Sequence, residues 1–167
     1  MKISIVQAVK DLSPGYFALV MATGILSIAA HFAGWGWTGG LFFKLNQVAY
    51  SALWVLIMVR LMRFRSNLVA DLVDHRRGAG FFTIVAGTCV LGSQFVILVQ
   101  NPAMGVFLWF LGIVVWFLII YSFFTAVMIR EVKPNLPEGL TGGWLIAVVS
   151  TQSTSILGVL IAPSFFP

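Results

Sequence analysis

The sequence has little charge. Only 9% of its 167 residues are Asp, Glu, Lys or Arg, whereas 60% are hydrophobic. A soluble domain carries charge on about a quarter of its residues, so there are too few charged side chains here to coat a water-exposed surface. The sequence therefore predicts a membrane protein. Nucleic-acid binding is not expected. In a membrane protein the net charge of +5 first indicates which loops stay in the cytoplasm, and it need not indicate a polyanionic partner.

Cysteine and histidine are also scarce. The sequence holds Cys89, His31 and His75, which excludes an intrachain disulfide and is too few for a four-ligand structural zinc site. The two histidines lack the facing positions within a helical bundle that a bis-histidine haem needs. No catalytic triad or paired carboxylates can be assembled at membrane depth. We expect no metal, no cofactor and no enzymatic activity, and keep a membrane oxidoreductase as a third hypothesis.

Five apolar runs are long enough to cross the hydrocarbon layer as helices, which takes about 20 residues. They predict an all-α, polytopic membrane protein with a single transmembrane domain over residues 1–167. Ser13 followed by Pro14 is typical of a helix start, and the pattern over residues 64–75 predicts a short surface helix. The predicted spans are residues 14–34, 41–62, 80–99, 105–129 and 141–162.

The basic residues are distributed unevenly about these spans. Of the ten Lys and Arg, all except Lys44 fall on one side. Because positively charged loops stay in the cytoplasm, we expect the N-terminus to be cytoplasmic and, after five crossings, Pro167 to lie outside. The expected location is the inner or plasma membrane of the cell. The basic residues on the predicted cytoplasmic side are Lys2, Lys10, Arg60, Arg63, Arg65, Arg76, Arg77, Arg130 and Lys133.

Small and polar residues are concentrated in the first, third and fifth spans. In lipid such residues face protein or water, so the odd spans are predicted to be internal and the even spans to face lipid. Residues 150–155 are six consecutive hydroxyl or amide residues, which packing alone does not require, so part of this turn is expected to contact water or a permeant solute. The candidate pathway residues are Thr23, Gly24, Ser27, Gly87, Thr88, Gly92, Ser93, Gln94, Thr151, Gln152 and Ser153.

Three stretches are familiar in combination: DLSPGYFALVMATGI at residues 11–25, HRRGAGFFT leading to GTCVLG at 75–92, and GWL leading to STQS at 143–153. Together they resemble the tellurite-resistance/dicarboxylate transporter family, which includes bacterial tellurite-resistance proteins, yeast malate permeases and plant slow anion channels. The resemblance implies ten helices in five hairpins, odd-numbered helices lining a central pore for anions or C4-dicarboxylates, and trimers. The chain resembles only the first five helices, and the family's gating phenylalanine, on the ninth helix, has no counterpart here.

Two functions from different classes stay open. One is the N-terminal part of a channel or carrier for a small anion or C4-dicarboxylate, embedded in the lipid bilayer. The other is a structural or regulatory membrane subunit that conducts nothing, because Gly-rich helix faces could equally serve association alone. The length of the chain fits a fragment of a longer protein, a half that must associate, or a non-functional remnant.

Overall fold

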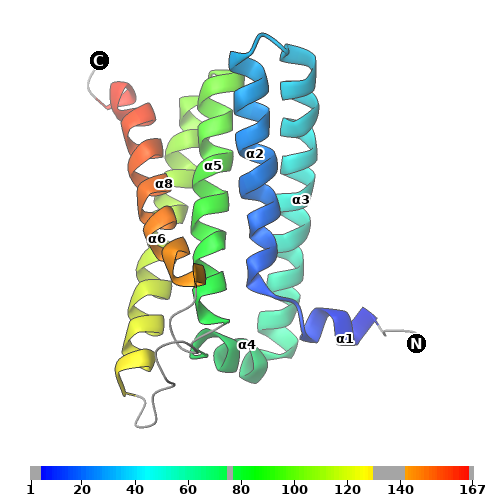
Figure 1. Cartoon of the computed structure of the whole chain (residues 1–167), viewed down its shortest axis with the longest axis vertical. Helices are drawn as coiled ribbons and strands as arrows, with labels where there is room; N and C mark the ends of the chain where they lie inside the picture. The colour runs from blue at the N-terminus through cyan, green and yellow to red at the C-terminus, as the bar shows by residue number, and fades with distance from the viewer. Residues whose placement is uncertain (1–4, 75–76, 130–141, 166–167) are drawn as a thin grey trace.

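The computed structural model describes residues 5–74, 77–129 and 142–165, and in these ranges the chain is helical and has no strand. The predicted all-α fold is confirmed. Five helices, with their short 3-10 extensions, are long and apolar enough to cross a membrane, and they run side by side in Figure 1. These candidate spans are Pro14–Phe32, Gly36–Arg63, Gly78–Val99, Pro102–Ile129 and Gly142–Ser164.

The odd-numbered spans share one local design. Each of their helices, α2 (Phe17–Phe32), α5 (Phe82–Val99) and α8 (Leu145–Ile161), follows a 3-10 turn that contains glycine and an aromatic residue. These helices have 16, 18 and 17 residues. The even-numbered spans, α3 (Gly36–Arg63) and α6 (Pro102–Ile129), have 28 residues each. The 3-10 turns before the odd spans are η1 (Pro14–Tyr16), η2 (Gly78–Phe81) and η3 (Gly142–Trp144).

Two short helices lie at one end of the bundle: in Figure 1 one extends sideways from it and the other crosses it. They are α1 (Ile5–Lys10) and α4 (Arg65–Leu72), and we call this end the α1/α4 end. Helix α4 lies within the range where the sequence predicts a surface helix. The turn between α2 and α3 and the last 3-10 turn, η4 (Ala162–Ser164), lie at the opposite end.

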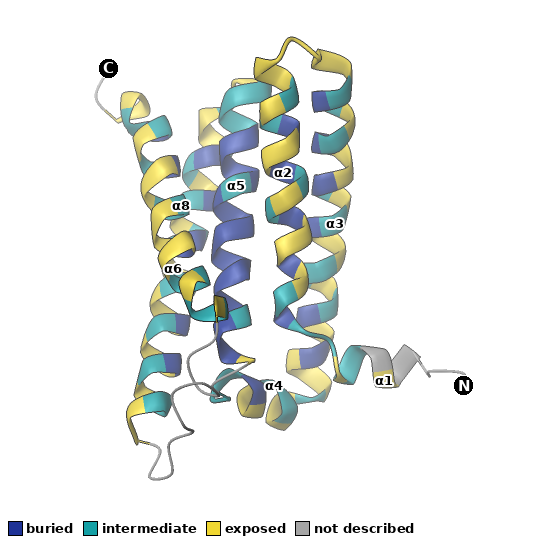
Figure 2. Ribbon diagram, viewed as in Figure 1, coloured by how far each residue is buried: buried dark blue, intermediate teal, exposed yellow. Residues whose placement is uncertain are grey.

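Helix α5 is the centre of the bundle. In an apolar 18-residue stretch of its span, 72% of the residues are buried, against 17–22% in each of the other four spans. Figure 2 shows α5 buried along most of its length, while α2 and α8 each carry a broad exposed face. The predicted contrast between internal odd spans and lipid-facing even spans therefore holds within this chain for the third span, and not for the first and fifth.

Small residues let the helices approach closely at the crossing points. A Cβ atom added to Gly24 of α2 would lie 2.4 Å from Cγ1 of Val90 on α5. A Cβ atom added to Gly92 of α5 would lie 2.5 Å from Cδ2 of Leu157 on α8. Without hydrophobic attraction between helices in lipid, such close van der Waals contact is a main source of association.

The structure shortens two predicted connections. Residues 35–40 are predicted to link the first two spans, but α3 already begins at Gly36, directly after a left-handed turn at Gly34 (φ 81°). Gly39 is helical and buried against α2: the Ser27 hydroxyl donates to its carbonyl at 2.7 Å, and an added Cβ atom would lie 3.1 Å from the Ser27 carbonyl oxygen. Helix α6 begins at Pro102, where the Asn101 side chain accepts the backbone N–H of Met104. Glycine and proline were therefore poor markers of loops here.

Some residues used in the sequence analysis lie outside the described residues, so the structure gives no account of them. They are Lys2, His75, Arg76, Arg130, Lys133, Thr141 and Pro167.

Replacing Gly24 by Ala should lower the melting temperature of the purified protein in detergent, with a loss of about 1–3 kcal/mol from overpacking between α2 and α5. Gly40→Ala is the matched control, because a Cβ atom at Gly40 of α3 meets nothing within 4 Å. The control should be neutral, or stabilising by up to about 1 kcal/mol, since Ala is the better helix former. Equal melting of the two variants would contradict the close packing of α2 on α5.

Candidate functional site

A groove of about 230 Å³ lies where α2, α5 and α8 meet. All three odd-numbered spans contribute side chains to it. Six of its lining residues are aliphatic and two are serines, so the surface is apolar with hydroxyl groups at two points. The lining residues are Ile25, Ile28, Val90, Ser93, Ile97, Ser153, Ile156 and Leu160.

Ser93 and Ser153 are the members of the predicted pathway set that line this groove. Val90, Ser93 and Ile97 follow the three- and four-residue spacing that places side chains on one face of a helix. The Ser93 hydroxyl donates to the carbonyl of Cys89 at 3.0 Å, and the Ser153 hydroxyl donates to the carbonyl of Val149 at 2.8 Å. Each hydroxyl proton is therefore bonded within its own helix, and the lone pairs of each oxygen can still accept hydrogen bonds from other groups.

The polar run of α8 follows the same rule. Its five hydroxyls all donate to backbone carbonyls three or four residues earlier, at 2.7–3.1 Å. Such bonds satisfy a hydroxyl donor at membrane depth without water. These bonds account for the five hydroxyls and not for the Gln152 amide, and the expected contact of part of this turn with water or a permeant solute stays a prediction. The hydroxyl residues are Ser150, Thr151, Ser153, Thr154 and Ser155.

Four of the other candidates join helices rather than line the groove. The Thr23 hydroxyl donates to Asn46 Oδ1 at 2.7 Å, and Asn46 Nδ2 donates to Gln94 Oε1 at 2.6 Å, so α2, α3 and α5 share one chain of hydrogen bonds. Thr88 is bonded to the Tyr50 hydroxyl at 3.0 Å. With the bond from Ser27 to α3, these contacts fix the arrangement of α2, α3 and α5.

The three glycine candidates are contact points between helices. Gly24 and Gly92 lie at the crossings described above, and a Cβ atom at Gly87 of α5 would meet the Phe17 carbonyl at 3.4 Å and the Val20 side chain at 3.5 Å. Their position explains why small residues occur in the odd spans. Close packing at these glycines neither requires nor excludes a pathway nearby.

Thr151 and Gln152 lie on other faces of α8. Thr151 lines a groove of about 500 Å³ between α6 and α8, where the indole of Trp116 donates to its hydroxyl at 3.1 Å. In the same groove the indole of Trp109 donates to the Thr154 carbonyl at 3.0 Å. Gln152 is exposed and lines neither groove.

Sequence reasoning missed two kinds of residue. The first is the aliphatic lining of the groove, such as Ile25 and Ile28, which cannot be told from lipid-facing residues by hydropathy. The second is the pair Asn46 and Tyr50, which bond to α5 from an even-numbered span. Their spacing of four residues places an amide and a hydroxyl on one face of a helix, and this signal could have identified the side of α3 that faces protein.

Among the described residues, no group of three or more His, Cys, Asp or Glu side chains lies close enough to hold a metal ion. The polar groups near the groove are hydroxyls, amides and backbone carbonyls.

Comparison with known proteins bears on what such a groove does. Residues 11–167 match the family described as voltage-dependent anion channel. Two uncharacterized transporters of Methanocaldococcus jannaschii are similar, one 28% identical over 161 residues and the other 25% identical over 160 residues. Each match covers 93% of this chain and 46% of the relative, so the chain spans about half the length of these relatives. No solved structure gives a significant match.

Substituting single cysteines in a Cys89→Ala background should report whether the groove holds water. We expect Ser153→Cys to react with a small charged thiol reagent roughly tenfold faster or more than Leu157→Cys, because the reactive thiolate forms only where water reaches it. Leu157 lies one turn further along α8 and is fully buried. Faster labelling at Phe117→Cys on α6 than at Ser153→Cys would reverse the assignment of inner and outer faces.

Proposed function

Because the chain belongs to the voltage-dependent anion channel family, we propose that it forms part of a pathway that carries anions across a membrane. The proposed substrates are inorganic anions or C4-dicarboxylates. The observation that supports this best is the groove in which α2, α5 and α8 meet, with two hydroxyls and no charged side chain among its lining residues. A neutral, partly polar lining lets an ion enter and also leave, whereas a fixed charge would hold it.

Stabilisation of a passing anion requires donors. We propose that the hydroxyl protons of Ser93 and Ser153 turn from their helix carbonyls toward the anion. Those carbonyls also accept bonds within their own helices, so little is lost when the hydroxyl leaves. The three odd-numbered helices run in the same direction, so their positive dipole ends lie together at the α1/α4 end and favour anions there.

Orientation and assembly complete the proposal. The α1/α4 end carries Arg60, Arg63, Arg65 and Arg77. Because basic residues prefer the cytoplasm, we propose that this end and the N-terminus lie inside. The opposite end, with the exposed Trp35 and Trp37, then lies outside, where aromatic side chains suit the lipid interface. We further propose that the protein forms a homo-oligomer, as the trimers implied by the resemblance suggest.

The competing function is a non-conducting membrane subunit. Two observations favour it: the hydroxyls of α8 are satisfied within their own helix, and the glycines of the odd spans serve close packing. Neither feature needs a permeant ion. Flux measurements decide between the two functions.

Liposomes that contain the protein expressed from its complete reading frame should conduct or exchange anions, and chloride, nitrate and malate tested separately would define the substrate class. Ser153→Ala should lower this flux about tenfold, because a hydroxyl that can donate a hydrogen bond to the anion is lost from the groove, at a cost of about 1–3 kcal/mol. The variant should still insert, since losing the hydroxyl makes the span more apolar.

Ser155→Ala is the matched control for Ser153→Ala: it also removes a hydroxyl from α8, but Ser155 does not line the groove of α2, α5 and α8, and the flux of this variant should be unchanged. Cation-selective flux or no flux from the unmodified protein would overturn the proposal. Normal flux in Ser153→Ala, combined with failed assembly of Gly92→Leu, would favour the subunit.

A reporter enzyme fused after Pro167 tests the orientation. With five crossings and a cytoplasmic N-terminus, a reporter that works only outside the cytoplasm should be active and one that works only in the cytoplasm should be silent. A fusion made directly after Arg63, at the α1/α4 end, should give the reverse result. Cytoplasmic activity of the Pro167 fusion would refute the span count or the orientation.

A further inference from the structure

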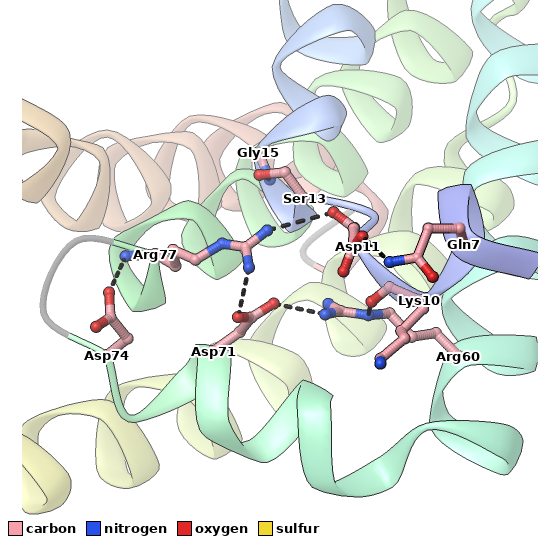
Figure 3. Close-up of polar contacts among 9 residues, drawn as sticks. All are labelled: Gln7, Lys10, Asp11, Ser13, Gly15, Arg60, Asp71, Asp74 and Arg77. Carbon is pink, nitrogen blue, oxygen red and sulfur yellow. Dashed lines mark hydrogen bonds and ion pairs between the residues drawn. The ribbon is translucent and has the colours of Figure 1, made fainter. Parts of the chain in front are cut away.

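A cluster of charged side chains at the α1/α4 end joins four segments of the chain (Figure 3). At its centre is Asp71 of α4, whose two carboxylate oxygens accept from different arginines. Nη2 of Arg60, in the last turn of α3, lies 2.5 Å from Oδ2 of Asp71, and Nη1 of Arg77, just before η2, lies 2.8 Å from Oδ1. One carboxylate therefore links the end of α3 to the segment that leads into α5.

The same two arginines hold the end of α1. Nε of Arg60 donates to the carbonyl of Lys10 at 2.9 Å, and Nη2 of Arg77 donates to the carbonyl of Asp11 at 3.3 Å. Carbonyls at the end of a helix lack intrahelical partners, and cations are favourable there. Asp71 thus orients two guanidinium groups so that they cap α1 at consecutive carbonyls.

This cluster is buried unevenly. The Arg60 side chain is 1% exposed and that of Asp71 is 11% exposed, whereas the Arg77 side chain is 44% exposed. Within the described residues, Nη1 of Arg60 is buried and has no hydrogen-bond partner. A buried ion pair adds little net stability, and an unused donor reduces it further, but such a pair can specify one arrangement of the chain. The cluster is thus better suited to positioning than to stabilising.

Further contacts connect this arrangement to the helices of the groove. Residues 10 and 11 lead directly into η1 and α2, and Arg77 leads into η2 and α5. The Thr83 hydroxyl of α5 donates to the Pro14 carbonyl at 2.9 Å, and a Cβ atom at Gly80 would lie 3.3 Å from the Gly15 backbone nitrogen. The starts of α2 and α5 are therefore in contact, and the charged cluster lies directly beside that contact.

We propose that Asp71 is a positioning residue for the α1/α4 end of the pathway: by holding Arg60 and Arg77, it fixes the segment entering α2 against the segment entering α5. This inference rests on the proposed transport function. Without the carboxylate, two cationic groups would face each other, and the carbonyls of Lys10 and Asp11 would lose the groups that hold them. The start of α2 would then move relative to α5.

Trypsin offers a direct test, because it cleaves after Lys10, at the peptide bond whose carbonyl Arg60 holds. With protein in detergent, Asp71→Asn should be cut at this bond about tenfold faster or more, since cleavage follows the population of the released segment. Asp71→Glu should retain slow cleavage because it keeps the charge. Asp74→Asn is the control. It also removes a negative charge near Arg77, but its amide oxygen can still accept the backbone N–H of Arg77, as the Asp74 carboxylate does. Unchanged cleavage in Asp71→Asn would overturn the inference.

A transport measurement on the same variants separates positioning from simple attachment of α1. Flux of Asp71→Asn should fall and that of Asp71→Glu should recover, while Asp74→Asn stays normal. Faster cleavage with normal flux would show that the cluster only anchors α1, and would overturn the positioning role. If the unmodified protein carries no anion, the transport proposal fails, and the cleavage result still shows whether the cluster holds α1.

Should Asp71→Asn fail to fold, Arg77→Gln provides the same test. It removes the more exposed arginine and leaves the pair of Arg60 and Asp71 intact. Release of the Asp11 carbonyl should still speed cleavage after Lys10 and lower flux, both to a smaller extent. Cleavage and flux equal to those of the unmodified protein would overturn the inference.

Discussion

A polar group in hydrocarbon has only protein to bond with, and this constraint accounts for most of the structure. The hydroxyls of α8 donate to carbonyls of their own helix, and Asn46 bridges Thr23 and Gln94 across three helices. The central position of α5 follows from the same need. It carries Thr83, Thr88 and Gln94 as fully buried side chains, which only a helix surrounded by others can accommodate.

Much of the fold could be predicted from the sequence, because length and hydropathy act over about 20 residues and tolerate local errors. The apolar runs ended by charged residues correspond to the five long helices. The third span was identifiable as internal from its Gly, Thr and Gln side chains. The differences in span boundaries lie at the span ends: Gly36 and Gly39 belong to α3, and Gly39 packs directly against Ser27 and His31 of α2.

The site was less predictable, since residue type does not determine which way a helix face points. Ser93 and Ser153 line the groove, whereas Thr88 and Gln94 on the same helix as Ser93 bond to α3. The aliphatic lining has no signal of its own in hydropathy. Asp71 is one of several acidic residues near a loop in the sequence, and its role depends on Arg60 and Arg77 meeting at one carboxylate, which only the three-dimensional structure reveals.

The unequal lengths of the helices bear on how the protein sits in a bilayer. At about 1.5 Å per residue, α3 and α6 are roughly 42 Å long, whereas the odd-numbered spans, with their 3-10 turns at about 2 Å per residue, reach roughly 30–38 Å. The hydrocarbon core is about 30 Å thick, so the odd-numbered spans match it more closely, while α3 and α6 must tilt or protrude. Adjusting the tilt of the long helices would change how they pack on the shorter odd-numbered ones. The stability of the bundle should therefore depend on the acyl-chain length of the surrounding lipid.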